Sequence, residues 1–326
     1  LLPRSLTSGA PRLGLAGALT EALACTQSQF LLMGGPARVL VVHSPKDVTQ
    51  VKLLLNDVER RLKELEQKWS RYKPDSLISL INARAGSGIA TEVDAETYHL
   101  LEVCRKLWTE SDGLFDPTAG VLRQVWDFQR GTLREPEKLP ALLHCIGFDR
   151  VRVSSSTVQL EKPHAELDLG GVGKEYAADV AAAMLREAGY KNGLVELAGD
   201  IVALGHNPNR SPWQVGIRDP ASPEQSHMTL EIENAAVATS GSYYRTIHQG
   251  DHQYSHLLDP RTGWPAEGPR SATVIAENCL IAGAVSTVAC LKKTSEASEW
   301  LEESGLPWLL VSAEGALLGP LCQKSS

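Results

Sequence analysis

The sequence predicts an α+β fold. From Asp47 to Trp69 apolar residues recur at helical spacing, which predicts a long amphipathic helix with a charged outer face. Residues 151–153 and 157–160 alternate like the two arms of a hairpin. Strands and helices do not alternate regularly, and no repeat of fixed period is visible. A mixture of hairpins and helices is therefore favoured over a regular parallel sheet.

The other elements are predicted from local patterns in chain order. In the first half we expect a strand at 37–43, a short helix at 77–82 and a helix from about 94 to 110, where Gly113 suits a C-terminal cap. Residues 127–140 are charged and contain proline, so we expect them at the surface. In the second half the predicted strands are 193–197, 201–205, 213–217, 228–232, 235–239, 271–276 and 308–311, and the predicted helices are about 177–188, 280–291 and 295–304.

Composition narrows the class of protein. The chain has 326 residues, of which 43% are hydrophobic and 22% charged, which is typical of a globular protein with a sizeable core. Its net charge is −7, and no stretch concentrates the basic residues, so nucleic acid is not an expected partner. The six cysteines have no metal-ligand spacing. No apolar run reaches the roughly 18 residues of a membrane-spanning helix, so no integral membrane segment is expected.

The first 30 residues leave two interpretations open. The small and apolar residues from Leu13 to Leu19, followed by residues 22–25, are typical of a remnant export signal, although Glu21 interrupts them. A flexible N-terminus explains the same stretch. We expect residues 31–326 to form a single domain.

A glycine-rich segment, Asp168–Asp179, is the centre of the functional argument. Three glycines fall within four positions, at 170, 171 and 173, directly before a helical composition. Such a cluster indicates positive φ angles, or a ligand that a Cβ would block. The helix start that follows offers free N–H groups to an anion such as phosphate. A tight connection explains the same glycines, because the spacing matches neither the dinucleotide fingerprint nor the P-loop.

Three further loops, 70–76, 113–120 and 240–263, combine polar side chains with turn residues. Tyr72 could offer a flat ligand an aromatic surface, or could be a surface residue at a helix exit. Asp116 could accept a hydrogen bond from a ligand, or could be a turn residue before Pro117.

The last of these loops carries a histidine and an arginine. His256 could take a proton from a hydroxyl near neutral pH, or could be a structural histidine. Arg261 could hold a phosphate, or could pair with Asp259.

Taken together, six ordered segments resemble the ApbE-like family of FAD:protein FMN transferases. The resemblance covers roughly residues 31–316. The matching segments are Met33–Gly35, Ser70–Ser76 with Asn82, Phe115–Gly120, Asp168–Asp179, Ala238–Tyr243 and Ser255–Pro265.

The resemblance implies a fold, a reaction and a location. The fold would be two intertwined α/β halves with mixed sheets and a central flavin-binding groove. Mg²⁺ would bridge the pyrophosphate of FAD, a Thr or Ser hydroxyl of an acceptor flavoprotein would attack the FMN phosphorus, and AMP would leave. Some relatives use water instead and act as FAD pyrophosphatases. A bacterial periplasmic or inner-membrane-associated location would follow.

The resemblance also implies the site residues. His256 would lie nearest the attacking hydroxyl. Gly171 would offer its carbonyl oxygen to the metal, and Thr287 its side-chain oxygen. The flavin nucleotide would be lined by Met33, Tyr72, Leu114, Phe115, Asp116, Asp168, Lys174 and Leu257.

The chain departs from the family pattern at a metal-binding position. Gly283 stands where the late motif Ala-Asp-Ala-x-x-Thr has its aspartate, and losing this charge should weaken Mg²⁺ binding. Gly35 replaces a threonine, and Glu196 and Ala198 replace an asparagine and a glycine. Two functions therefore compete: an FMN transferase in which another carboxylate such as Asp168 compensates, and a non-catalytic FAD-binding protein.

Overall fold

The computed structural model describes residues 22–243, 245–250 and 252–324. The α-helices in these ranges are α1 (Val48–Trp69), α2 (Leu77–Ala83), α3 (Ala95–Glu110), α4 (Leu139–Leu143), α5 (Gly173–Glu187), α6 (Cys279–Leu291) and α7 (Thr294–Glu303). Short 3-10 helices lie at Pro45–Asp47, Gly120–Gln124, Pro136–Lys138, Phe148–Arg150 and Pro320–Lys324.

The strands form one large sheet and several small ones. An eight-stranded sheet has the order β1-β2-β8-β9-β12-β15-β16-β17, and its strands are β1 (Ala24–Leu32), β2 (Gly35–His43), β8 (Gly193–Leu197), β9 (Asp200–Leu204), β12 (Ala235–Gly241), β15 (Ser271–Ala276), β16 (Trp308–Val311) and β17 (Leu317–Leu318). The smaller sheets contain β3 (Thr91–Glu92) with β7 (Thr157–Leu160) and β6 (Val151–Val153), β4 (Trp126–Asp127) with β5 (Thr132–Leu133), β10 (Trp213–Asp219) with β11 (Ser222–Ile232), and β13 (Thr246–Gln249) with β14 (His252–Ser255).

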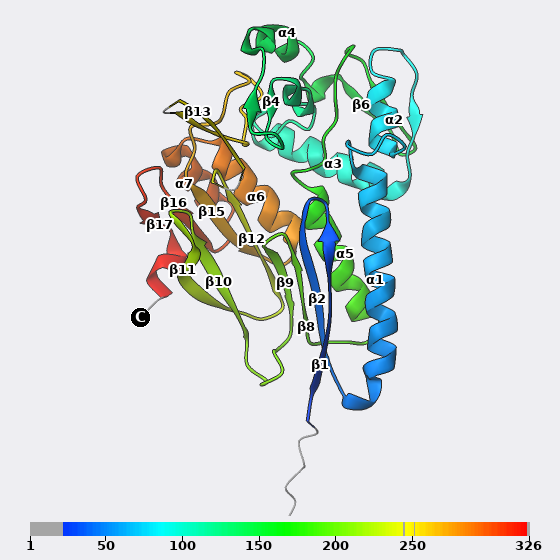
Figure 1. Cartoon of the computed structure of the whole chain (residues 1–326), viewed down its shortest axis with the longest axis vertical. Helices are drawn as coiled ribbons and strands as arrows, with labels where there is room; N and C mark the ends of the chain where they lie inside the picture. Colours follow the sequence, from blue (N-terminus) through cyan, green and yellow to red (C-terminus); the bar gives the residue numbers. More distant parts are fainter. Residues whose placement is uncertain (1–21, 244, 251, 325–326) are drawn as a thin grey trace, which may run out of the picture.

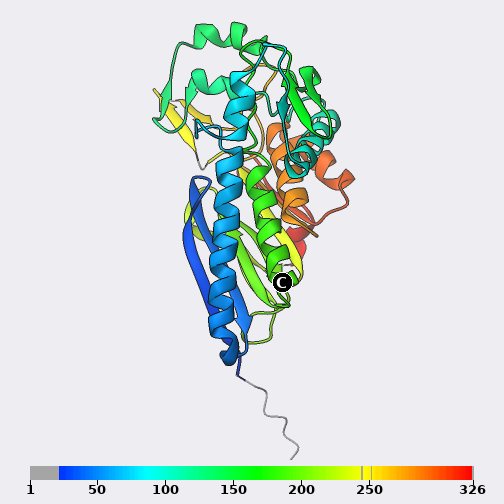
Figure 2. The same cartoon turned by 90° about the vertical axis from the view of Figure 1, so that its right-hand side faces the viewer.

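Neighbouring strands of the large sheet are antiparallel throughout. Helices α1, α5 and α6 cover one face of this sheet, and the β10–β11 hairpin packs on the other (Figures 1 and 2). Separate helices and antiparallel hairpins confirm the α+β prediction.

Helix α1 has the predicted bounds to within one residue. Its buried face carries Val51, Leu55, Val58, Leu62 and Leu65, and packs against β1 and α5. Because these positions recur every three or four residues, they line one side of the helix. The apolar pattern alone was therefore enough to place α1.

Residues from α2 to β7 gather at one end of α1, and we call this segment the cap (Figures 1 and 2). The β13–β14 hairpin also lies there, because Ile247 and Tyr254 pack with Trp126 of β4 in one apolar cluster. The indole Nε1 of Trp126 donates a hydrogen bond to the carbonyl of Gly263 over 2.7 Å. The loop that contains His256 is thereby fixed to the cap.

The N-terminal boundary differs from the prediction. Strand β1 begins at Ala24 and pairs with β2 along its whole length, so regular structure starts before residue 31. The sequence of β1 hides this because polar residues fall on both faces of the strand: Gln27 and Gln29 are exposed, and Thr26 and Ser28 are partly buried. The rest of the predicted leader or flexible stretch, residues 1–21, lies outside the described residues.

Two other boundaries moved as well. Helix α5 begins at Gly173 instead of residue 177, and β11 begins at Ser222 instead of residue 228. In the part of the chain that is described, no helix is long and apolar enough to cross a bilayer.

Candidate functional site

The first residues of the glycine segment connect the cap to α5. Packing explains some of its glycines. None of Gly170, Gly171 and Gly173 has a positive φ, so the first explanation suggested by the sequence is wrong. A Cβ on Gly171 would lie 2.8 Å from Cε2 of Phe115, which explains that glycine by a close approach between two loops. A Cβ on Gly173 would meet nothing closer than 3.9 Å. Gly173 is therefore not required for packing.

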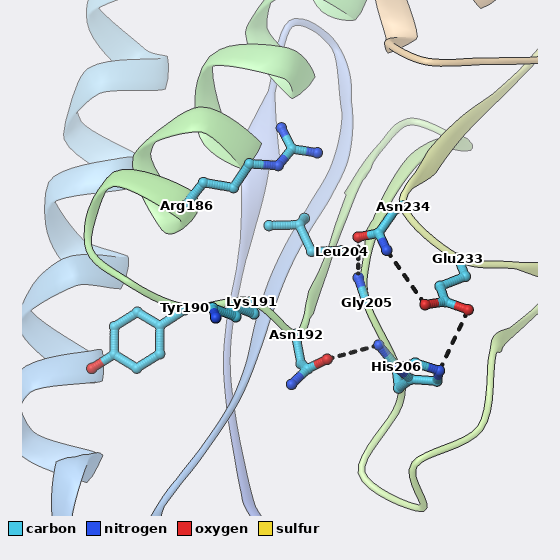
Figure 3. A pocket seen from close by; sticks show the side chains of 9 residues that line it. All are labelled: Arg186, Tyr190, Lys191, Asn192, Leu204, Gly205, His206, Glu233 and Asn234. Atoms are coloured by element: carbon cyan, nitrogen blue, oxygen red, sulfur yellow. Dashed lines mark hydrogen bonds and ion pairs between the residues drawn. The ribbon is translucent and has the colours of Figure 1, made fainter.

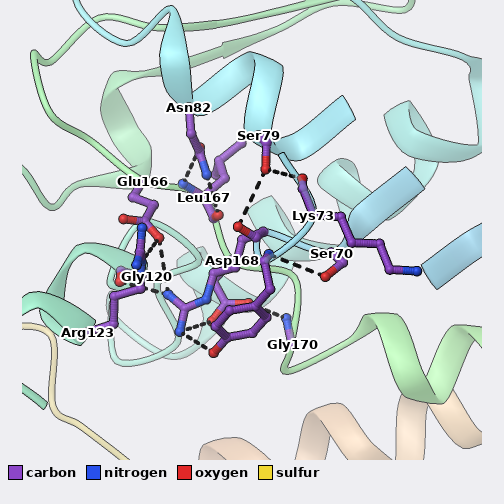
Figure 4. Close-up of polar contacts among 12 residues, drawn as sticks. Ser70, Lys73, Ser79, Asn82, Gly120, Arg123, Glu166, Leu167, Asp168 and Gly170 are labelled. Carbon is purple, nitrogen blue, oxygen red and sulfur yellow. Dashed lines mark hydrogen bonds and ion pairs between the residues drawn. The ribbon is translucent and has the colours of Figure 1, made fainter. Parts of the chain in front are cut away.

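A charge network joins three of the loops at Asp168 (Figure 4). The buried guanidinium of Arg71 donates to the Gly120 carbonyl over 2.8 Å, and its Nη2 lies 3.3 Å from Oδ2 of Asp168. The carboxylate of Glu166 accepts from Arg71 and from Arg123. Because Asp168 is one-third exposed, this network presents a carboxylate to solvent.

Backbone contacts hold the same loops together. The amide of Asp168 donates to the carbonyl of Pro117 over 2.8 Å. The side-chain amide of Asn82 donates to the Leu167 carbonyl and its oxygen accepts from the Leu167 amide (Figure 4). Loop 113–120 and helix α2 are thus both fixed to residues 167–168.

Tyr72 and Met33 lie at the edge of this region. The Tyr72 side chain is 60% exposed, and its hydroxyl accepts a hydrogen bond from Arg71 over 3.1 Å. The Met33 amide donates to Oε1 of Glu66 over 2.5 Å, and Lys73 donates to Oε2 of the same residue. These contacts fix the Tyr72 hydroxyl and the Met33 backbone; that the two side chains line a ligand site stays a prediction.

The carboxylate of Asp116 has a structural role within the protein. Its carboxylate accepts from the amide and hydroxyl of Thr118, from Nε1 of Trp108 and from the amide of Phe148. Burial raises the pKa of Asp116, against the effect of these hydrogen bonds. The carboxylate is occupied within the protein, and the side chains of Leu114 and Phe115 are buried. Any contact of this loop with a ligand is therefore expected from its backbone.

Lys174, Glu175 and Asp200 form a second, deeper charge cluster. The ammonium of Lys174 donates to Oε1 of Glu175 over 2.9 Å and also to Oδ2 of Asp200. Burial alone would lower the pKa of Lys174, but the two carboxylates raise it well above its ordinary value. Lys174 is therefore charged, and burial raises the pKa of Asp200.

Hydroxyl groups from β12 and α6 lie beside this cluster. The amide of Thr239 donates to Oδ1 of Asp200 over 3.2 Å. The Oγ atom of the next residue, Ser240, lies 2.9 Å from Oγ1 of Thr287 and 2.9 Å from Oγ of Ser286. Thr287 is thus hydrogen-bonded to Ser240, the residue that follows the Asp200 contact at Thr239 on β12.

Among the described residues no group of three or more His, Cys, Asp or Glu side chains could hold a metal ion. Mg²⁺ does not need such a group, because it keeps several waters and is commonly bound by one or two carboxylates together with substrate phosphates. Two carboxylates beside several hydroxyl oxygens fit that requirement.

His256 is held at the junction of the cap and α6. Its ring lies edge-on to Phe128 with 6.3 Å between centroids, and its amide donates to the Arg245 carbonyl. Burial and the charge of Arg245 lower the pKa of His256 to about 4, so the imidazole is neutral at pH 7. The buried Nδ1 has no hydrogen-bond partner in the described structure. The next residue, Leu257, packs beside α6.

The predicted site residues therefore fall into connected groups. Tyr72 and Asp168 both contact Arg71, and Phe115 packs against Gly171. Lys174 lies in the same glycine segment as Asp168 and Gly171. No contact between His256 and Asp168 is seen in the described residues. The loop that contains His256 packs on β4 and α6 instead.

A surface pocket elsewhere contains none of these residues. It lies at the other end of α5, near Arg186, Asn192 and His206 (Figure 3). Because α5 separates it from the glycine segment, this pocket is not part of the candidate site.

Sequence reasoning missed several contributors. Glu166 pairs with Arg71 across 95 residues, and only the tertiary fold reveals such a pair. Asp179 accepts from the amides of Cys279 and Leu280 and so caps α6 from α5. Glu175 and Asp179 both lie in the glycine segment, and two carboxylates so close to a helix start are a sequence signal for a charged site.

The fold and the loop network define an α+β protein with a charged site between the cap and a large antiparallel sheet. The chain belongs to the ApbE family, whose family model matches residues 33–310.

Relatives agree with this assignment. The FAD:protein FMN transferase of Treponema pallidum is 30% identical over 292 residues, which cover 81% of this chain and 80% of the relative. The crystal structure of the ApbE protein from Thermotoga maritima is similar with a TM-score of 0.83 and 29% identity, over 92% of this chain and 98% of that one. The flavin transferase ApbE from Vibrio cholerae has a TM-score of 0.81 and 25% identity, over 91% and 96% of the two chains.

Proposed function

We propose that this protein transfers FMN from FAD to a Thr or Ser hydroxyl of an acceptor protein, with Mg²⁺, and releases AMP. The observation that carries the proposal is the junction of loops 70–76, 113–120 and 168–173 at one partly buried charge network. The names of the relatives supply the reaction.

The residues of the site suit distinct parts of FAD. The exposed ring of Tyr72 offers a stacking surface for the isoalloxazine, close to Asp168. The N–H groups in the first turn of α5 favour the pyrophosphate, because they carry the positive end of the helix dipole. Met33 and Leu257, which are partly exposed, supply apolar surface around these groups, and the buried side chains of Leu114 and Phe115 hold the loop that carries them.

The transfer step needs a proton acceptor and neutralised phosphate oxygens. The acceptor hydroxyl attacks the FMN phosphorus, the bond from phosphorus to the AMP oxygen breaks, and the hydroxyl proton passes to the neutral ring of His256. When bound, Mg²⁺ would neutralise charge on the non-bridging oxygens, with the Gly171 carbonyl and Thr287 Oγ1 among its ligands.

The test is to incubate the purified protein with FAD, Mg²⁺ and a peptide that carries an acceptor threonine. We expect AMP release and covalent flavin on the peptide in equal amounts. A His256→Asn variant should retain FAD and lose about 10²–10⁴-fold in transfer rate.

The two alternatives give different products. AMP and free FMN without modified peptide would identify a pyrophosphatase. FAD bound equally well with and without Mg²⁺, and no AMP, would identify a non-catalytic flavin-binding protein, which Gly283 at the metal position favours. Either result would overturn the proposal. The periplasmic or inner-membrane-associated location and the single domain over residues 31–326 stay predictions.

A further inference from the structure

The space beside Gly283 is filled by another residue's carboxylate. A Cβ built on Gly283 would lie 2.3 Å from Cγ, 3.1 Å from Cδ and 3.2 Å from Oε1 of Glu175. Gly283 lies on α6 and Glu175 on α5, so the contact joins two helices. A carboxylate is therefore present at the position where Gly283 lacks one, although it comes from a different helix.

The Glu175 carboxylate has an unused oxygen. The residue is 4% exposed, Oε1 accepts from Lys174, and the buried Oε2 has no hydrogen-bond partner in the described structure. An unsatisfied buried carboxylate oxygen is costly, and because no described protein group uses this one, it is available to coordinate a bound cation.

The surrounding charges favour a cation. One ammonium, that of Lys174, faces two carboxylates, those of Glu175 and Asp200, so the three groups together carry one formal negative charge. The carboxylate of Asp179, on the same helix, is occupied by the amides of Cys279 and Leu280. Asp168 is occupied as well, by Arg71 and the Gly170 amide.

Neutral oxygen ligands lie on the same side of α6. Thr287 follows Gly283 by four residues, so the two positions are neighbours on one helix face. The carboxylate that packs on Gly283 is thus about one helical turn from the Thr287 hydroxyl.

We propose that Glu175 supplies the anionic ligand of the Mg²⁺ site in this chain, in place of an aspartate at position 283. The inference rests on the proposed function for the identity of the cation. It assigns the compensating role to Glu175 and not to Asp168, which the sequence had suggested.

The first experiment measures metal binding directly. The full chain with saturating FAD is titrated with Mn²⁺, and free Mn²⁺ is followed by electron paramagnetic resonance. Glu175→Gln keeps the shape of the side chain and removes its charge, and we expect it to weaken Mn²⁺ binding about tenfold or more. Glu187→Gln is the matched control, because Glu187 is exposed at the end of the same helix. The control should bind Mn²⁺ like the wild type.

The second experiment exchanges the two positions. Gly283→Asp alone should lower the melting temperature, because its Cβ overlaps the Glu175 side chain. Glu175→Ala should bind Mn²⁺ weakly, and the double variant Glu175→Ala, Gly283→Asp should recover about tenfold or more in affinity, because it returns a carboxylate to the same space. Thermal unfolding establishes that each variant is folded.

Three outcomes decide the inference. Weakening by Glu175→Gln with recovery in the double variant would support it, even if the wild type transferred no flavin, in which case only the proposed function would fail. Unchanged Mn²⁺ binding by a folded Glu175→Gln variant would overturn it, even if the wild type transferred flavin. A folded double variant that binds no better than Glu175→Ala would also overturn it.

Discussion

His256 illustrates how one partly buried residue contributes to the response of stability to pH. Its pKa is lowered to about 4 from 6.5 by burial and by Arg245, so the unfolded chain binds a proton at this residue that the folded protein does not bind. Stability therefore falls as the pH falls from about 6.5 towards 4, and this contribution is constant below 4.

We expect proton uptake by His256 in the unfolded chain to lower the free energy of unfolding by about 2 kcal/mol between pH 7 and pH 5. The measurement is the free energy of unfolding by urea at both pH values, for the wild type and for His256→Gln. The variant should lose about that much less stability on acidification. An identical pH dependence in the two proteins would show that His256 is not held neutral by its surroundings.

Gly120 and Gly173 make a matched pair of substitutions to alanine. A Cβ on Gly120 would lie 2.7 Å from the Glu166 carbonyl oxygen and 3.0 Å from Nη1 of Arg71, whereas Gly173 has room for one. Gly120→Ala should lower the free energy of unfolding by about 1–3 kcal/mol through overpacking. Gly173→Ala should raise it by about 0.4–1 kcal/mol, because alanine restricts the unfolded chain. Equal effects in denaturant unfolding would contradict the packing described here.

At the scale of elements, Asp179 fixes the relation between α5 and α6. Its two carboxylate oxygens accept from the amides of Cys279 and Leu280 over 2.7 and 2.9 Å. Asp179→Ala leaves these buried amides without partners and should cost about 1–3 kcal/mol.

Asp179→Asn keeps one accepting oxygen and should recover part of this stability. Because Glu175 and Gly283 face each other across the same two helices, the alanine variant should also bind FAD and Mg²⁺ more weakly. Thermal unfolding and FAD fluorescence titration measure the two effects. Full stability in Asp179→Ala would mean that packing alone fixes α6.

The elements also show what sequence can and cannot predict. Helix α1 was predictable because every buried position lies on one stripe, and β15 because a short run of small and β-branched residues is typical of a buried strand. Strand β1 was not, because alternate residues are exposed and only pairing with β2 makes the segment a strand.

The site was predictable to a similar extent. Its loops were found from their turn residues, but the partners of their charges were not. Arg71 contacts Glu166 and Gly120, and Gly283 contacts Glu175, over separations of 49 to 108 residues, as the numbering shows. Such contacts depend on how the cap and the two helices pack, which no local pattern encodes.

At the scale of the whole molecule, the site draws residues from both the cap and the large sheet, so its ligands should bind cooperatively. FAD at about 100 times its dissociation constant should add about 2.7 kcal/mol of stability, or about 4 °C in melting temperature for a chain of this size. Because the same site would hold both ligands, FAD and Mg²⁺ together should shift the melting temperature by more than the sum of their separate shifts. Differential scanning fluorimetry measures all three, and purely additive shifts would mean that the two ligands do not meet.

The order of the large sheet has a consequence for how the polypeptide matures. Strand β2 pairs with β8, and about 150 residues, including the whole cap, lie between them in the sequence. While the chain is being synthesised, β2 has β1 beside it but exposes its other edge until β8 has left the ribosome. Closing so long a loop is slow. During that interval a row of unpaired backbone N–H and C=O groups is available to other nascent chains, so a chaperone that shields β2 should improve the yield of this protein more than one that acts on the completed polypeptide.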